Sequence, residues 1–173
     1  LHDHIKAGDA KRDESIEKVI KMFSIMDELD IRTICFNWMA YVGWTRTSKD
    51  LPERGGARVT GFNIADYVPT DASITEDQLW ANYKYFIEAV IPEAEKHNID
   101  LALHPDDPPI ANLGGVSRIM INYDNIKYAL KMVKQTGYGV AVPSLNDMKL
   151  ENPEIIKQGP RYGVKLKAVA GGR

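Results

Sequence analysis

The 173-residue chain is long enough for one domain with a substantial apolar core. It is 44% hydrophobic and 27% charged with a net charge of −2, which is typical of a globular protein and leaves no basic excess for holding a nucleic-acid backbone. No apolar run approaches the roughly 18 residues that a membrane span needs. Neither a nucleic acid nor a membrane is therefore expected as a partner.

The cysteine content and the first residues bear on the compartment. Cys35 is the single cysteine of the chain, which excludes an intramolecular disulfide, and its apolar run IRTICF favours a buried small hydrophobic residue over a nucleophile. The opening residues LHDHIKAGDAKRDES are unlike a secretory signal peptide. Leu1 is not a natural initiator, so we expect sequence upstream of it. A reducing cytoplasm is the expected compartment.

Three segments have the apolar spacing of amphipathic helices. They cover residues 13–30, residues 75–98 and about 124–134, and a weaker helix is expected near 153–158. Thr75 and the acidic residues after it predict an N-terminal cap, and Pro92 predicts a kink. The expected buried stripes are Val19, Ile20, Phe23, Met26 and Leu29 in the first helix and Leu79, Tyr83, Phe86, Val90 and Ile91 in the second.

Short apolar, β-branched runs between these helices predict strands. Strands are expected at 31–36, 99–104 and 138–142, with a further possible strand at 164–169. The alternation of strands and helices predicts a parallel α/β sheet with right-handed crossovers. The segment 37–75 reads as one long irregular loop, and loops of that length are usually functional or disordered.

Functional groups of parallel α/β folds lie at the carboxyl ends of strands. That rule selects His104, which ends an apolar strand and is followed at once by two carboxylates and three prolines. Neutral imidazole is a common ligand of divalent metals, so His104 is a candidate metal ligand. The alternative is a histidine that forms an ordinary hydrogen bond at the strand end.

The same rule selects polar side chains in the loops that follow the two strands. Arg46 is a candidate bidentate clamp for a substrate carboxylate, or else a solvated loop arginine. Asp106 and Asp107 could orient a ligand or bind a hydroxyl group, or they could simply form the turn before proline. His97 is expected as a solvated residue at a helix end.

Four stretches of the sequence resemble the mannonate dehydratase family. They are HDHIKAGDAKRDESIE (2–17), ICFNWMAYVGWTRT (34–47), IEAVIPEAEKHNIDLALH (87–104) and LALHPDDPP (101–109). The resemblance runs from about residue 1 to 134, and the WTRT loop followed by HPDDPP is its most specific part. It implies a partial, xylose-isomerase-like (β/α) TIM-type barrel of about four βα units, with residues 1–173 forming one incomplete barrel domain.

The resemblance also implies a function. Members of the family are lyases that dehydrate D-mannonate to 2-dehydro-3-deoxy-D-gluconate in hexuronate (glucuronate) catabolism, with a divalent metal that is typically manganese or iron. His104 matches a metal ligand, and Asn37 and Arg46 match positions that face the active-site mouth, with Asp106 as a further substrate contact. The family's acid/base groups lie further toward the C-terminus, so no catalytic residue is assigned here.

Residues 135–173 diverge from the family pattern. Pro143 falls at about the position of the family's cysteine ligand, and no histidine occupies the next ligand position. One of four expected metal ligands is therefore present, and we expect the isolated chain to be inactive. Two alternatives stay open: another metal-dependent sugar isomerase or epimerase on the same barrel, or a non-catalytic fragment that self-associates. The expected partners are a sugar acid and, in a homo-oligomer, further copies of the chain.

Overall fold

The computed structural model describes residues 1–137 and 164–166. The helices are α1 (Asp3–Ala7), α2 (Arg12–Glu28), α3 (Glu76–Lys96) and α4 (Tyr123–Gln135). The strands are β1 (Thr33–Asn37), β2 (Ser48–Pro52), β3 (Arg58–Gly61), β4 (Asp100–His104), β5 (Asn112–Leu113), β6 (Val116–Ser117) and β7 (Val164–Leu166), and single 3-10 turns occupy Arg54–Gly56 and Ile64–Asp66. Within this part of the chain, no helix has the length and apolar character to cross a membrane.

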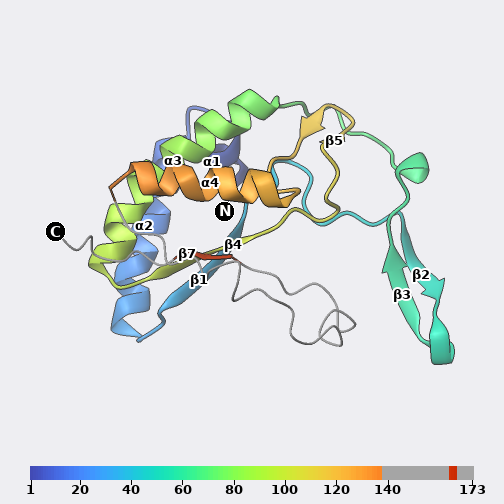
Figure 1. The fold of residues 1–173 in the computed structure, drawn as a ribbon, viewed down its shortest axis with the longest axis horizontal. Coiled ribbons are helices and arrows are strands. Elements are labelled where there is room, and N and C mark those ends of the chain that lie inside the picture. Colours follow the sequence, from blue (N-terminus) through green and yellow to red (C-terminus); the bar gives the residue numbers. More distant parts are fainter. Residues whose placement is uncertain (138–163, 167–173) are drawn as a thin grey trace.

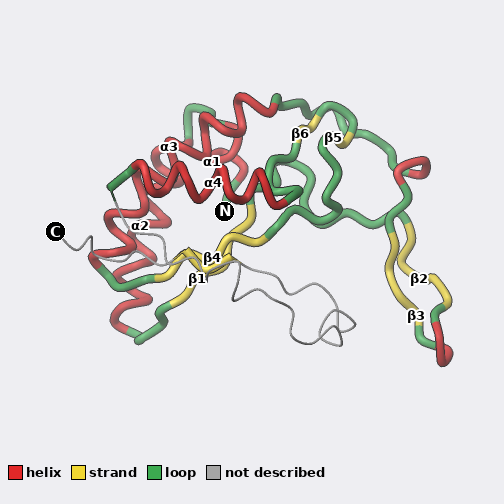
Figure 2. Tube along the Cα trace, in the orientation of Figure 1, coloured by secondary structure: helices red, strands yellow, loops and turns green. Residues whose placement is uncertain are grey.

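The centre of the fold is the parallel pair formed by β1 and β4 (Figure 2). Their register runs without a break from the pair Thr33 and Asp100 to the pair Asn37 and His104. The two strands therefore end at the same level. The predicted parallel α/β unit is confirmed for this pair of strands.

Helices cover one face of the pair (Figure 1), and α3 contacts α1, α2, α4 and β4. Phe36, Leu101 and Leu103 point to the covered face and are buried. Cys35 lies on the opposite face and is exposed, so its prediction as a buried residue is wrong. The reason is the alternation of side chains along a strand. Among the described residues no second layer covers the face on which Cys35 lies.

The start of α3 is fixed by the cap that the sequence predicts. The Thr75 hydroxyl accepts a hydrogen bond from the backbone N–H of Gln78. In return, Oε1 of the Gln78 side chain accepts one from the backbone N–H of Thr75. This reciprocal pair satisfies two backbone donors that a helix start leaves without partners. The helix then continues through Pro92 to Lys96. All five residues of its predicted apolar stripe, Leu79, Tyr83, Phe86, Val90 and Ile91, are buried.

The first predicted helix is present as α2, but its buried face differs from the predicted stripe. Phe23 and Met26 are buried as predicted, whereas Leu29 lies beyond the helix end and is exposed. The five-residue α1 precedes it and was not predicted. So short a helix offers no apolar period, and its local signals are the His2 side chain that caps it and Gly8 in the left-handed region.

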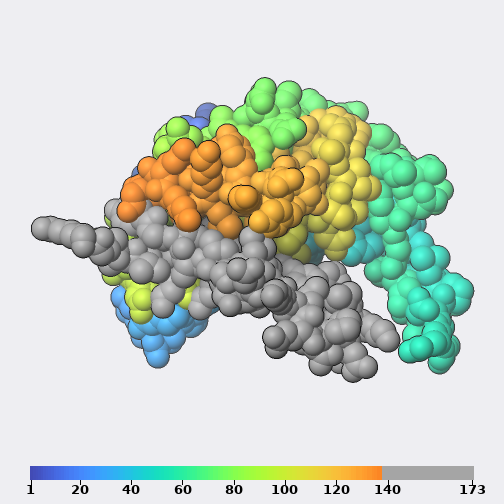
Figure 3. Space-filling view, viewed as in Figure 1, coloured from blue at the N-terminus to red at the C-terminus, as the bar shows by residue number. Residues whose placement is uncertain are grey.

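The segment 37–75 is not one irregular loop, because it contains the antiparallel hairpin of β2 and β3. The hairpin projects from the body of the molecule (Figure 3). Most of its side chains are exposed. Two exposed strands lack the alternation of apolar and polar residues that reveals a half-buried strand, which is why the sequence did not predict them.

The strand expected at 164–169 is present as β7, but it pairs with β4 in the antiparallel direction. The sheet order is β1-β4-β7, so the expectation of an all-parallel sheet is wrong for this strand. The free edge of β4 offers unpaired backbone groups to a strand of either direction, and antiparallel pairing is slightly more stable per residue. The strand expected at 138–142 and the helix expected near 153–158 lie outside the described residues.

The capping box yields a direct prediction. Thr75→Ala removes the hydroxyl acceptor at the start of α3, and we expect the free energy of unfolding in urea to fall by about 1 kcal/mol. Ser73→Ala, two residues earlier at an exposed position, is the matched control and should stay within about 0.5 kcal/mol of the wild type. Equal losses in the two variants would contradict a specific role for the cap.

Candidate active site at the strand ends

The carboxyl ends of β1 and β4 bring the predicted site residues together. Asn37 ends β1 and His104 ends β4, and the two residues are partners in the strand register. The loop after β1 returns over the end of β4, where the Trp44 ring meets the His104 imidazole edge-on with centroids 5.5 Å apart. Trp44 remains 63% exposed. An aromatic side chain of the first loop thus borders the imidazole of the second strand.

Arg46 belongs to the same group through an ion pair with Asp107. Its Nη1 donates to Asp107 Oδ1 at 3.0 Å and its Nη2 donates to Oδ2 at 2.6 Å. This is the bidentate geometry in which a guanidinium and a carboxylate match best. Both side chains are about one third exposed. The ion pair joins the loop after β1 to the loop after β4 at the edge of the site.

The orientation of His104 is set by its own backbone. Nδ1 lies 2.6 Å from the Pro105 carbonyl oxygen, which can only accept a hydrogen bond. Nδ1 is therefore the donor in this contact, and in the tautomer with one proton on Nδ1 the lone pair lies on Nε2. A metal-binding histidine typically has this arrangement, with one nitrogen donating to a carbonyl and the other free to ligate.

Asp106 is placed differently from the other predicted site residues. It is 3% exposed, and its Oδ2 accepts a hydrogen bond from the Met120 amide at 3.0 Å. The Asp106 amide in turn donates to the Met120 carbonyl oxygen at 2.9 Å. Burial raises the pKa of the Asp106 carboxyl group, and the hydrogen bond from Met120 opposes that rise. Its Oδ1 has no hydrogen-bond partner among the described residues, and because the side chain is almost fully buried, Asp106 lies beneath the site instead of facing its mouth.

Arg118 was not predicted, although it connects both loops of the site. Its side chain is 2% exposed. Nη2 donates to the carbonyl oxygens of Val42 and Gly43, each at 2.8 Å, and Nη1 lies 3.4 Å from the Pro108 carbonyl oxygen. Burial lowers the pKa of its guanidinium, against the opposing charge of Asp106. The sequence signal was a lone cation in the apolar run VSRIM.

Lys6 is a second buried cation that was not predicted. It extends from α1 and is 5% exposed. Its Nζ donates to the Met39 carbonyl oxygen at 2.8 Å and to Asn37 Oδ1 at 3.3 Å. Burial lowers the pKa of its ammonium group, and the nearby charges of Asp3 and Asp106 oppose that shift. Two cations therefore lie beneath the strand ends.

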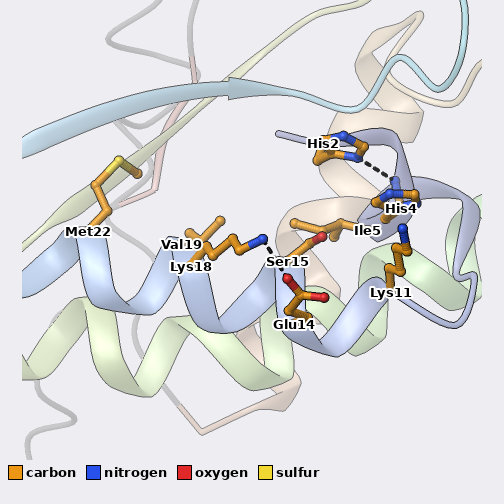
Figure 4. A pocket seen from close by; sticks show the side chains of 9 residues that line it. All are labelled: His2, His4, Ile5, Lys11, Glu14, Ser15, Lys18, Val19 and Met22. Atoms are coloured by element: carbon orange, nitrogen blue, oxygen red, sulfur yellow. Dashed lines mark hydrogen bonds and ion pairs between the residues drawn. The ribbon is translucent and has the colours of Figure 1, made fainter.

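A separate hollow lies between α1 and the first half of α2 (Figure 4). It shares no lining residue with the group at the strand ends. An ion pair between Lys18 and Glu14, 2.6 Å long, crosses its wall, and the stacked rings of His2 and His4 border it. The lining residues are His2, His4, Ile5, Lys11, Glu14, Ser15, Lys18, Val19 and Met22. The predicted chemistry is therefore not located there.

Comparison with known proteins identifies the family. Residues 1–72 match the family model for D-mannonate dehydratase (UxuA). The mannonate dehydratase of Oceanobacillus iheyensis is 31% identical over 188 residues, which cover 91% of this chain and 54% of the relative. The crystal structure of mannonate dehydratase from Streptococcus suis serotype 2 matches with a TM-score of 0.70 and 31% identity, over 76% of this chain and 40% of that one. The chain belongs to the mannonate dehydratase family.

The matches cover only part of the length of the related enzymes. The chain spans about half the length of the mannonate dehydratases it matches; for that of Streptococcus agalactiae the share is 48%, at 31% identity. Residues 84–172 also match the family model for the middle domain of stage IV sporulation protein A, so the C-terminal half belongs to a second family as well. The two family models do not overlap, whereas the curated mannonate dehydratases align across both ranges.

The divalent metal that the family resemblance implies would have an incomplete site in the described part of the chain. His104 offers one nitrogen ligand, but no group of three or more His, Cys, Asp or Glu side chains comes together among the described residues. Selective binding of such an ion usually takes three or four protein ligands. The described residues therefore do not fit a complete metal centre of this family.

The buried guanidinium gives the second prediction. Arg118→Leu removes the donors to carbonyl oxygens in both loops, and a buried acceptor left without a donor costs about 1–3 kcal/mol. We expect the free energy of unfolding in urea to fall by at least about 2 kcal/mol for this reason. Arg54→Leu, at an exposed position in the hairpin, is the control and should be nearly neutral. A loss no larger than that of the control would show that Arg118 does not hold the loops.

Proposed function

We propose that this chain is part of a lyase that dehydrates D-mannonate to 2-dehydro-3-deoxy-D-gluconate in hexuronate breakdown. One observation supports the proposal: Asn37, Arg46 and His104 lie together where β1 and β4 end side by side. The chain that carries them belongs to the mannonate dehydratase family. In this proposal the β1–β4 unit is one section of a xylose-isomerase-like (β/α) barrel, whose functional residues gather at this end.

Each of the three side chains has a proposed task. Arg46 would hold the carboxylate of the sugar acid, and the Asn37 amide would bind one of its oxygens. His104 would contribute its Nε2 as one ligand of a manganese or iron ion. The groups that abstract the proton beside the carboxylate and protonate the departing hydroxyl are not assigned, because the family resemblance implies that they lie further toward the C-terminus.

The ion pair between Arg46 and Asp107 affects how a substrate carboxylate could reach the guanidinium. In the structure, the guanidinium fork is already matched to the two oxygens of Asp107. A substrate carboxylate would therefore displace Asp107 from part of the fork or approach a remaining N–H group. In both cases Asp107 holds the Arg46 guanidinium near the site before the substrate arrives. Less side-chain entropy is then lost when the substrate binds.

Substitution of the arginine tests this role in a complete enzyme. Removal of the proton places further negative charge on the substrate carboxylate, so a fork that matches two oxygens should bind the transition state more strongly. Arg→Lys and Arg→Ala at the residue of a complete mannonate dehydratase that matches Arg46 should both lower kcat/KM, alanine more. Loss of a charged hydrogen-bonded pair suggests about 2–5 kcal/mol for alanine, or roughly a 30- to 4,000-fold drop. Near-normal turnover in the alanine enzyme would place the carboxylate clamp elsewhere.

The metal prediction concerns the chain itself. Because His104 is the one family ligand that can be placed, we expect the 173-residue chain to bind manganese weakly or not at all at neutral pH. Isothermal titration of wild type and His104→Ala should give the same weak heats. A tight stoichiometric site that disappears in His104→Ala would mean that the chain supplies further ligands and that the centre is complete.

A second candidate function is a non-catalytic chain that persists by self-association. It is favoured by the incomplete set of metal ligands, since no group of three or more His, Cys, Asp or Glu side chains comes together among the described residues. Size-exclusion chromatography with metal analysis separates this candidate from a functioning enzyme: an inactive, metal-free oligomer supports it. Another sugar isomerase or epimerase on the same barrel would be revealed by a substrate panel. A cytoplasmic location and a homo-oligomer remain parts of the proposal.

A further inference from the structure

The side-chain amide of Asn37 is held by two donors on the same oxygen. Oδ1 accepts a hydrogen bond from Lys6 Nζ at 3.3 Å and another from the Met39 amide at 3.2 Å. A carbonyl oxygen has two lone pairs, so these two hydrogen bonds use the full acceptor capacity of Oδ1. The opposite orientation of the amide would turn its NH2 group toward an ammonium and a backbone N–H. The environment of Asn37 therefore fixes which end of the amide faces inward.

Lys6 is itself fixed in place. Its Nζ donates to the Met39 carbonyl oxygen at 2.8 Å, and the Asp3 carboxylate lies 3.8 Å away. The Asn82 side chain donates to the Lys6 carbonyl oxygen at 2.9 Å, which ties α1 to α3. Lys6 is 5% exposed, so moving its ammonium group would leave the buried Met39 carbonyl oxygen without its hydrogen-bond donor. Lys6 thus acts on Asn37 as a rigid donor.

A buried lysine beside a candidate site could alternatively serve as a proton acceptor. The contacts argue against that role, because Nζ donates to the Met39 carbonyl oxygen and to Asn37 Oδ1, and both of these oxygens can only accept. Lys6 is also almost completely covered, whereas Asn37 stands at the end of β1 beside His104. A ligand at the strand ends would therefore meet the amide of Asn37 and not the amine of Lys6.

We propose that Lys6 is a positioning residue that holds the Asn37 amide with its NH2 group presented to the site as a donor. Among the described residues no hydrogen bond of Asn37 Nδ2 competes with this task. The ligand group that such a donor selects is an oxygen acceptor, namely a hydroxyl or carboxylate oxygen of a sugar acid. This assignment of the ligand rests on the proposed function, but the fixed orientation of the amide does not.

Nuclear magnetic resonance of the 15N-labelled 173-residue chain tests the orientation without a ligand. The Asn37 side-chain NH2 signals are assigned by their loss in Asn37→Asp. In Lys6→Met, which keeps the stem but has no donor, these signals should shift and broaden. They should be unchanged in Lys21→Met, an exposed lysine on α2. Unchanged signals in Lys6→Met would overturn the proposal.

The wild-type chain offers a second measurement if Lys6→Met does not fold. With Oδ1 facing Lys6, the Asn37 NH2 protons should give no nuclear Overhauser effect to the Lys6 ε-methylene protons. A strong effect would show the opposite orientation and overturn the proposal.

Addition of D-mannonate then tests the ligand. The Asn37 NH2 signals should shift in the wild type, and the dissociation constant should rise about tenfold in Lys6→Met, the cost of one hydrogen bond. Binding that leaves the Asn37 NH2 signals unmoved would overturn the donor role. If D-mannonate shifts no signal at all, the proposed substrate fails, while the ligand-free measurements still decide whether Lys6 orients Asn37.

Discussion

The parallel pairing of β1 with β4 is the constraint on which the candidate site depends. Five successive residue pairs, from Thr33 with Asp100 to Asn37 with His104, bring both strands to an end at one level. The polar residues that follow each strand must then share one edge of the sheet. A shift by one residue would turn one of the two terminal side chains to the helix-covered face, and the site would be lost. The register is thus the link between the buried core and the chemistry.

Buried charge supports this edge from beneath. Lys6 and Arg118 donate to carbonyl oxygens of the loop after β1, and Arg118 also reaches the loop after β4. Burying these cations costs free energy, which is offset because Lys6 donates to the Met39 carbonyl oxygen and to the Asn37 side chain, and Arg118 donates to three backbone carbonyl oxygens. At Met39, Val42, Gly43 and Pro108, where the loops have no regular structure, charged side chains bind the backbone in place of sheet pairing. Their geometry is therefore sensitive to single substitutions beneath the site.

The core elements and the strand-end residues could be predicted because they leave periodic or positional signals. The stripe of α3 and its Thr75 cap are local patterns, and His104 ends an apolar run. The exposed hairpin, the exposure of Cys35 and the burial of Asp106 depend on what packs against them, which no local pattern encodes. Lys6 resembles a solvated cation in the sequence, and although Arg118 interrupts an apolar run, the roles of both residues follow from carbonyl oxygens distant along the chain.

Mapping where D-mannonate binds tests most directly whether the ends of β1 and β4 form a sugar-acid site. In 1H–15N spectra of the 173-residue chain, the account predicts shifts confined to the residues that follow β1 and β4, within 37–47 and 104–109. The hollow between α1 and α2 should be unaffected. Shifts centred on that hollow, or no shift at saturating ligand, would contradict the claim that the strand ends form the sugar-acid site.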